Sequence, residues 1–198
     1  MSEIFHFFSN IDFNWSVIES IAVISSITYV ILATKQNIWC WVFAVISVLL
    51  YIYICFNARL FAETGLQVFY LIMAAYGYYS WKKPLKPLRV KQWETSTHLL
   101  IILCGGVLAF MLGFYFTTYT NAKIPIADSF TTVFAIIATY MVTQKILENW
   151  LYWIIIDTVS IYLYSQRDLQ LTSLLFAIYT FIAIIGYFSW LRKIKEHV

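Results

Sequence analysis

Charged side chains are scarce in this sequence. Asp, Glu, Lys and Arg make up 12% of the 198 residues, whereas soluble domains carry about 25%. Hydrophobic residues reach 62% and aromatic residues 20%. A chain of this length cannot bury so much apolar surface in one aqueous core, and large exposed apolar patches aggregate in water. The scarcity of charge therefore excludes a soluble globule and predicts a protein whose solvent is lipid.

Glycine, proline, cysteine and histidine are also rare, at six, three, three and three residues. This excludes collagen-like and low-complexity chains. The cysteines have no C-x-x-C spacing and the histidines are scattered, which argues against a metal site. The net charge of +3 is too small and dispersed for nucleic acid, and the sequence has neither a P-loop nor a nucleophile elbow. We therefore expect no cofactor, no metal, no nucleic-acid partner and no enzymatic activity.

Long apolar runs account for most of the chain. A helix needs about 20 apolar residues to cross a hydrocarbon core of roughly 30 Å at 1.5 Å per residue. We expect one all-α membrane domain over residues 1–198, with seven transmembrane helices. These are Trp15–Thr34, Ile38–Phe56, Leu60–Trp81, Leu99–Tyr119, Pro125–Thr143, Trp150–Tyr164 and Thr172–Trp190.

The first three expected helices resemble the last three. When the sequence is aligned with itself at one constant offset, Ala75–Lys83 (AYGYYSWKK) falls on Ile184–Arg192 (IIGYFSWLR), and glycine, tyrosine, serine and tryptophan recur in register. An interfacial belt of Trp and Tyr is the alternative explanation, but a belt does not require a constant offset across three helices. We expect a parallel 3+1+3 repeat, with repeat one at about 15–83, a linker helix at about 99–119 and repeat two at about 124–192.

The sixth expected helix carries aromatic and polar residues on one face. Trp150, Trp153, Asp157, Ser160 and Tyr164 follow one another at intervals of three or four residues. A carboxylate inside a bilayer costs about 2.5–3.5 kcal/mol and marks a functional site by default, and indole faces attract cations. The pattern predicts that Asp157, Trp153 and Trp150 bind a cationic heterocycle. The alternative is an interfacial tryptophan belt, with Asp157 hydrogen-bonded to a neighbouring helix.

The third expected helix offers a second set of polar residues. Glu63, Gln67 and Tyr70 lie three or four residues apart. A buried glutamine amide can both donate to and accept from a heterocycle, although it can equally join two helices. We expect these residues and the sixth helix to line one central substrate site. Glu19 and Asp128, near helix starts, are interpreted instead as charges that complement the helix dipole.

Two stretches resemble the PnuC family of bacterial vitamin transporters: Asn57–Trp81 and Thr143–Leu175. The family motif W-x-x-W-x-x-x-[N/D] matches Trp150, Trp153 and Asp157. The motif L-x-A-x-x-x-L-Q-x-F begins at residue 60, and the likeness extends from about residue 15 to residue 190.

The resemblance also adds Asn149, which directly precedes that motif, to the expected substrate-binding residues. It implies a fold similar to an enlarged SWEET transporter, often as a homotrimer in the bacterial inner membrane. It further implies facilitated diffusion of an unphosphorylated vitamin that a cytoplasmic kinase traps.

The choice of vitamin rests on Asp157. Nicotinamide riboside and thiamine both carry a cationic aromatic ring. The carboxamide of nicotinamide riboside is complemented by the amide of an Asn or Gln side chain, whereas the aminopyrimidine of thiamine is complemented by a carboxylate. The resemblance implies asparagine at this position in nicotinamide riboside transporters. We therefore expect thiamine, with nicotinamide riboside as the alternative. A membrane vitamin receptor or scaffold that does not transport is the alternative from a different class.

Basic residues gather on one side of the expected helices. Cytoplasmic loops are enriched in lysine and arginine. With seven helices, only three basic residues fall on the side of the N-terminus, and the others share the side of the C-terminus: Lys35, Lys82, Lys83, Lys86, Arg89, Lys91, Lys145, Arg192, Lys193 and Lys195. This asymmetry predicts an outside N-terminus and a cytoplasmic C-terminus.

Reporter fusions test this orientation. A fluorescent protein at the C-terminus should fluoresce, and an alkaline phosphatase at the same place should be inactive, because phosphatase folds only outside the cytoplasm. Fusions truncated after Lys123, in the loop before the fifth expected helix, are the control and should show the reverse pattern. Phosphatase activity at the C-terminus would contradict the predicted orientation.

Overall fold

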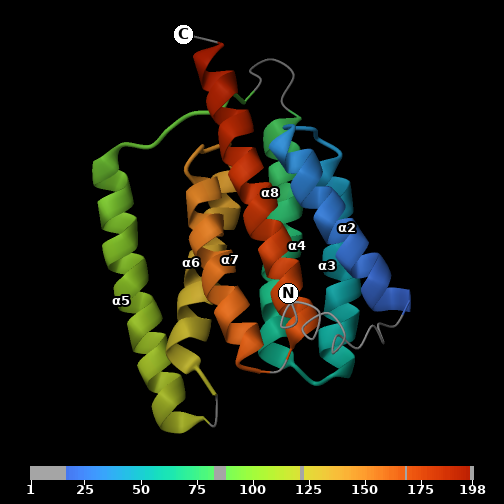
Figure 1. Ribbon diagram of the computed structural model, residues 1–198, viewed down its shortest axis with the longest axis vertical. Coiled ribbons are helices and arrows are strands. Elements are labelled where there is room, and N and C mark those ends of the chain that lie inside the picture. Colours follow the sequence, from blue (N-terminus) through green and yellow to red (C-terminus); the bar gives the residue numbers. More distant parts are fainter. Residues whose placement is uncertain (1–16, 83–87, 121–122, 168, 197–198) are drawn as a thin grey trace, which may run out of the picture.

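Helices are the only regular secondary structure in the part of the chain that the computed structural model describes, residues 17–82, 88–120, 123–167 and 169–196. These residues form seven helices, which confirms the seven expected from sequence (Figure 1): α2 (Val17–Thr34), α3 (Cys40–Asn57), α4 (Phe61–Trp81), α5 (Thr95–Tyr119), α6 (Pro125–Thr143), α7 (Asn149–Ser165) and α8 (Gln170–Lys195). The expected start at Trp15 and the basic residues Lys83 and Lys86 lie outside the described residues.

Helix lengths and hydropathy fit a protein that crosses a membrane. Five of the helices, α2, α3, α5, α6 and α8, are long and apolar enough to span a bilayer. The other two, α4 and α7, carry polar residues in their interiors, including Gln67 and Asp157. All the substrate-binding residues expected from the sequence lie on these two helices.

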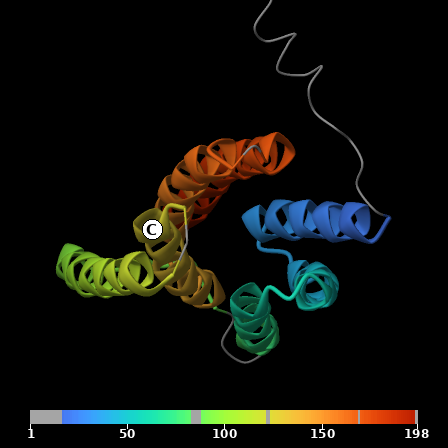
Figure 2. The same ribbon diagram turned by 90° about the horizontal axis from the view of Figure 1, so that it is seen from below.

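Six helices form a closed ring (Figure 2). Around the ring, α2 packs against α3, α3 against α4, α4 against α6, α6 against α7, α7 against α8, and α8 against α2. The even-numbered helices of the ring run in one direction and the odd-numbered ones in the other (Figure 1). We call the end of the ring where α2, α4, α6 and α8 finish the basic end, because most of the lysine and arginine residues lie there.

Helix α5 lies outside the ring and, among the described helices, packs only against α6. Its contact face consists of the buried small residues Gly105, Ala109 and Gly113. A Cβ atom on Gly113 would lie 2.7 Å from the Cα atom of Ile126. Small residues let two helix backbones approach closely in lipid, where apolar side chains gain little from leaving their solvent.

Two tryptophan–glycine contacts occur at equivalent positions of the two halves of the ring. The indole of Trp41 lies against Gly77, and the indole of Trp150 lies against Gly186. Each indole also meets a second tryptophan edge to face. The ring centroids of Trp41 and Trp81 are 5.2 Å apart, and those of Trp150 and Trp190 are 5.4 Å apart. These tryptophans belong to one buried cluster near the basic end.

The second tryptophan of each pair reaches into the other half of the ring. Trp81 Nε1 on α4 donates to the backbone oxygen of Thr143 at the end of α6, at 3.2 Å. Trp190 Nε1 on α8 donates to the backbone oxygen of Ala33 near the end of α2, at 3.1 Å. The two hydrogen bonds therefore tie each three-helix half to the other.

Helices α2 and α6 end in the same kind of turn. Gln36 and Lys145 adopt positive φ angles of 54° and 52°, a left-handed conformation that is uncommon outside glycine. Backbone hydrogen bonds hold each turn: Asn37 donates to Leu32 at 3.0 Å, and Ile146 donates to Met141 at 3.0 Å. This 6→1 bond is that of the Schellman motif, which satisfies carbonyl groups at a helix end.

Alanine substitution tests the tryptophan–glycine contacts. A Cβ atom at Gly77 would lie 2.3 Å from the indole of Trp41, and one at Gly186 would lie 2.7 Å from that of Trp150. Overpacking of this kind costs about 1–3 kcal/mol. Gly77→Ala and Gly186→Ala should each lower the melting temperature of the purified protein in detergent.

The matched control is Gly65→Ala, on the same helix as Gly77. A Cβ atom at Gly65 has no heavy atom within 4 Å, and alanine favours a helix over glycine by about 1 kcal/mol. This variant should keep or raise the melting temperature. Equal losses in the Gly65 and Gly77 variants would contradict the role assigned to the indole contact.

Candidate functional site

Asp157 lies inside the ring of helices. Its residue surface is 3% exposed, and Ile156 and Ser160 beside it on α7 are also buried. No hydrogen bond or ion pair of its carboxylate with another described residue is observed. A carboxylate in such a place needs a hydrogen-bond donor, a cation or water. Its position therefore suits a site that a cationic ligand occupies.

Two tyrosines lie in the neighbourhood of this carboxylate. Tyr70 of α4 and Tyr179 of α8 both lie within electrostatic range of Asp157. Tyr179 shares a short hydrogen bond with Ser26 of α2. Four helices of the ring, α2, α4, α7 and α8, thus contribute polar groups to one interior cluster, which we call the central polar cluster: Ser26, Tyr70, Asp157 and Tyr179.

Trp153 lies where α4, α6 and α7 meet. It packs with Tyr70 against a buried group on α6 that includes Phe134 and Ala138. Trp153 also packs against the tryptophan cluster near the basic end. One turn separates it from Asp157 on the same face of α7, so an aromatic surface and a carboxylate adjoin the same interior space. A cationic ring could contact both groups there.

Trp150 and Asn149 lie closer to the basic end, where they are packed among other buried side chains. Trp150 is 2% exposed and meets Trp190 edge to face. Asn149 is fully buried, and its Nδ2 donates to the backbone oxygen of Ile146 at 2.5 Å. Asn149 Oδ1 and Trp150 Nε1 are buried without a hydrogen-bond partner among the described residues. Substrate binding by these two residues stays a prediction.

The polar residues of α4 have different surroundings. Gln67 is partly buried one turn from Tyr70, and its side chain makes no hydrogen bond with the described residues. Glu63, in the first turn of α4, is exposed. The structure therefore brings Asp157, Trp153 and Tyr70 together and leaves Glu63 at the mouth of the ring.

Lys145 closes the basic end of the ring. Its Nζ donates to Gln36 Oε1 at 3.1 Å and lies 4.6 Å from the ring centroid of Trp81. Burial lowers the pKa of the Lys145 ammonium group. The backbone of Lys91 bonds to both sides of this turn, donating to Lys145 O at 3.0 Å and accepting from Leu147 N at 2.9 Å. A buried cation and its partners thus cap the interior at this end.

An ion pair spans the opposite end, where Asp128 of α6 pairs with Arg167 beyond α7. The guanidinium carbon of Arg167 lies 6.0 Å from the Tyr164 ring centroid, and Tyr164 stacks on Phe176 at 5.1 Å. The sequence-based interpretation of Asp128 as a dipole charge holds for its place in the first turn of α6. That interpretation did not include the cationic partner of Asp128, Arg167, which lies just after the end of α7.

Sequence reasoning missed several interior polar residues. Ser26 and Tyr179 are ordinary residues in apolar helices, and so is Tyr51, which lies close to Ser26. A signal was present, because Tyr70 and Tyr179 occupy equivalent positions in the two expected repeats and Tyr164 shares the helical face of Asp157. These tyrosines come together only when the two halves close into a ring.

The ring and the central polar cluster define a multi-pass membrane protein with polar groups on the inside of a helical ring. The family model described as nicotinamide mononucleotide transporter matches residues 16–192, and the chain belongs to this family.

Known proteins similar to this chain are transporters. It is 28% identical to the nicotinamide riboside transporter PnuC of Escherichia coli (strain K12), over 93% of this chain and 88% of that protein. It is 22% identical to the riboflavin/roseoflavin transporter RibM of Streptomyces davaonensis, over 80% of this chain and 77% of that protein. A crystal structure of the vitamin B3 transporter PnuC has the same fold, with a TM-score of 0.75, 22% identity, and coverage of 100% of this chain and 88% of that one.

The resemblance to the PnuC family seen in the sequence is thus confirmed, and the protein is a membrane transporter rather than an enzyme. The relatives named for a substrate carry nicotinamide riboside or riboflavin, so the expectation of thiamine finds no support among them.

Substitution of Asp157 separates a ligand-binding role from a structural one. A buried carboxylate without a partner destabilises the empty protein. Asp157→Asn should therefore keep or raise the melting temperature of the ligand-free protein.

Ser173→Ala is the comparison, because Ser173 Oγ on α8 donates to Ile161 O on α7 at 3.0 Å. Losing this bond should cost about 0.5–1.5 kcal/mol. A drop for Asp157→Asn as large as that for Ser173→Ala would indicate that Asp157 holds helices together.

Proposed function

We propose that this protein carries nicotinamide riboside across the membrane by facilitated diffusion. Support comes from the family model and from relatives named as nicotinamide riboside transporters. The observation that carries the proposal is the central polar cluster, in which the carboxylate of Asp157 is buried without a partner among the described residues. Trp153 lies one turn away on the same face of α7. The nicotinamide ring of the riboside is cationic, so the carboxylate offsets its charge and the indole stacks on it.

Thiamine is the second candidate, and Asp157 is the observation that favours it. A carboxylate offers only acceptors, which suit the amino group of an aminopyrimidine better than a carboxamide. Nearby hydroxyl groups of Tyr70 and Tyr179 can donate or accept, so they can complement either molecule. The two substrates therefore differ in the hydrogen-bonding group that suits them at residue 157.

The proposed architecture behind transport is a parallel 3+1+3 repeat, as in SWEET transporters. Its support is the set of features that recur at equivalent positions of the two halves: the indole–glycine contacts, the reciprocal tryptophan hydrogen bonds and the left-handed turns at Gln36 and Lys145. Transporters built this way bind substrate at the repeat interface. The central polar cluster draws residues from both halves of the ring, which is where such a site belongs.

The proposed cellular setting is the bacterial inner membrane, with the C-terminus in the cytoplasm. The basic end of the ring supports this orientation. Uptake by diffusion requires a sink, which a cytoplasmic vitamin kinase supplies by adding a phosphate that the carrier does not accept. A homotrimer, which the family resemblance implies, would bury part of the apolar surface that α5 exposes.

Counterflow in proteoliposomes tests the proposed function. Vesicles loaded with unlabelled nicotinamide riboside should take up labelled nicotinamide riboside without ATP or an ion gradient. Asp157→Ala should weaken apparent affinity by roughly 10- to 150-fold, since a charge-assisted contact is worth about 1.5–3 kcal/mol. Thr158→Val, on the exposed side of α7, is the control and should behave as the wild type.

The same vesicles decide between the candidates. Counterflow of labelled thiamine but not of nicotinamide riboside would replace the first candidate by the second. Binding without exchange would identify a receptor and contradict transport.

A further inference from the structure

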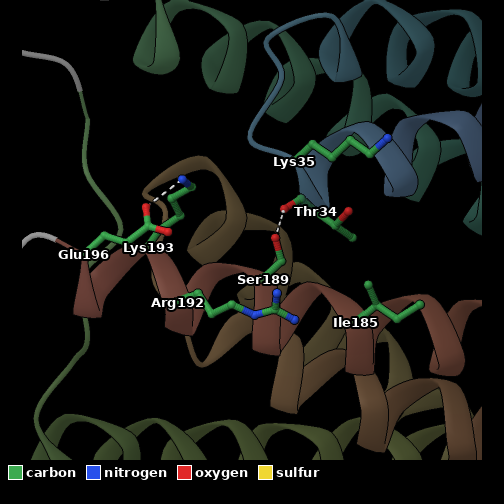
Figure 3. Close-up of a pocket in the computed structure, with 7 residues that line it drawn as sticks. All are labelled: Thr34, Lys35, Ile185, Ser189, Arg192, Lys193 and Glu196. Atoms are coloured by element: carbon green, nitrogen blue, oxygen red, sulfur yellow. Dashed lines mark hydrogen bonds and ion pairs between the residues drawn. The ribbon is translucent and has the colours of Figure 1, made fainter.

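A pocket of about 390 Å³ opens between the ends of α2 and α8 at the basic end (Figure 3). None of the residues expected to bind the vitamin lines it. Its walls come from both halves of the ring: Thr34 and Lys35 at the end of α2, Ile185, Ser189, Arg192 and Lys193 on α8, and Glu196 directly after α8. Ser189 Oγ donates to the backbone oxygen of Thr34 at 2.9 Å and joins the two helices there.

Two cations of this pocket have no partner among the residues that the structure describes. The side chains of Lys35 and Arg192 make no hydrogen bond or ion pair within the described part of the chain, and they extend on opposite sides of the Thr34–Ser189 bond (Figure 3). Lys193, by contrast, pairs with Glu196 at 2.7 Å. Glu196 also lines the pocket, but it pairs with Lys193, so Lys35 and Arg192 have no carboxylate partner among the described residues.

The other half of the ring provides an internal comparison. In the alignment that places Gly77 on Gly186, the positions equivalent to Lys35 and Ile185 are Gln144 and Tyr76. There, Gln144 Nε2 donates to the Tyr76 hydroxyl at 3.0 Å and bridges the corner between α6 and α4. The same helix ends thus meet twice, once bridged by a neutral hydrogen bond and once lined by Lys35 without such a bridge. The position equivalent to Arg192 is Lys83, which lies outside the described residues. The replacement of a neutral bridge by a lysine without a partner favours a ligand of negative charge at the corner between α2 and α8.

We propose that this pocket binds a phosphate group. A guanidinium matches two phosphate oxygens at once, so Arg192 can bind the phosphate directly. Lys35, on the other side of the Thr34–Ser189 bond, adds a second positive charge that attracts the phosphate. Two sources share this chemistry. One is the headgroup of an anionic phospholipid, which basic residues attract at a membrane surface, and the other is a soluble phosphate compound.

Thermal unfolding of the purified full-length protein in neutral detergent measures binding from either source. One arm adds dioleoylphosphatidylglycerol, with dioleoylphosphatidylcholine as the uncharged reference. The other arm adds inorganic phosphate against chloride at constant ionic strength. A rise in melting temperature that saturates with concentration gives an apparent Kd.

The variants follow from the internal comparison. Lys35→Gln and Arg192→Gln should each weaken the apparent Kd about fivefold, as expected for one basic residue at a membrane surface. Lys35→Gln combined with Ile185→Tyr copies the Gln144–Tyr76 pair, so it should remain folded and lose the ligand-dependent rise. Lys195→Gln, one turn along α8 and outside the pocket, is the matched control and should bind as the wild type.

Each outcome has a defined meaning. A rise with phosphatidylglycerol alone that the pocket variants lose supports a lipid headgroup, and a rise with inorganic phosphate that they lose supports a soluble phosphate. No rise in either arm overturns the proposal. A loss as large in Lys195→Gln as in Lys35→Gln also overturns it, because the effect would then reflect overall charge.

Discussion

The contact between an indole ring and a glycine backbone is the interaction on which the rest of the ring depends. In each half, a tryptophan of the second helix covers a glycine of the third: Trp41 covers Gly77, and Trp150 covers Gly186. This contact orients the neighbouring tryptophan, Trp81 or Trp190, whose indole N–H donates to a backbone oxygen of the opposite half. Packing inside one half therefore positions the hydrogen bond that joins it to the other half.

The outward and inward faces of the ring helices differ because they meet different environments. Most helices present large apolar side chains outward, where lipid replaces water as solvent. Polar side chains turn inward, and many of them satisfy a backbone carbonyl, as Ser47 Oγ does with Ala22 O at 3.0 Å. Asp157 has no such bond with the described residues. A carboxylate in an apolar interior lowers the stability of the fold, and such a loss of stability is common where a residue serves binding.

Much of the fold was predictable, because helix number and position follow from run length and charge. The last helix is longer than its apolar run, since Arg192, Lys193 and Lys195 continue it past Trp190. The site was less predictable. Asp157 and Trp153 stand out as polar and aromatic residues on one helix face, whereas the Ser26–Tyr179 contact joins two helices from opposite ends of the chain. Helical periodicity contains no information about which helix faces meet, so the sequence alone did not single out Tyr179.

The peripheral position of α5 has a consequence for how such a ring can be assembled. Three helices cross a membrane an odd number of times, so a second three-helix unit joined directly to the first would insert upside down. In the proposed 3+1+3 arrangement, one extra crossing by α5 restores the parity, and α5 stays outside the ring because its single contact among the described helices is with α6. A separate three-helix polypeptide has no parity to restore, and two copies inserted in the same orientation could close the same six-helix ring without any fourth helix.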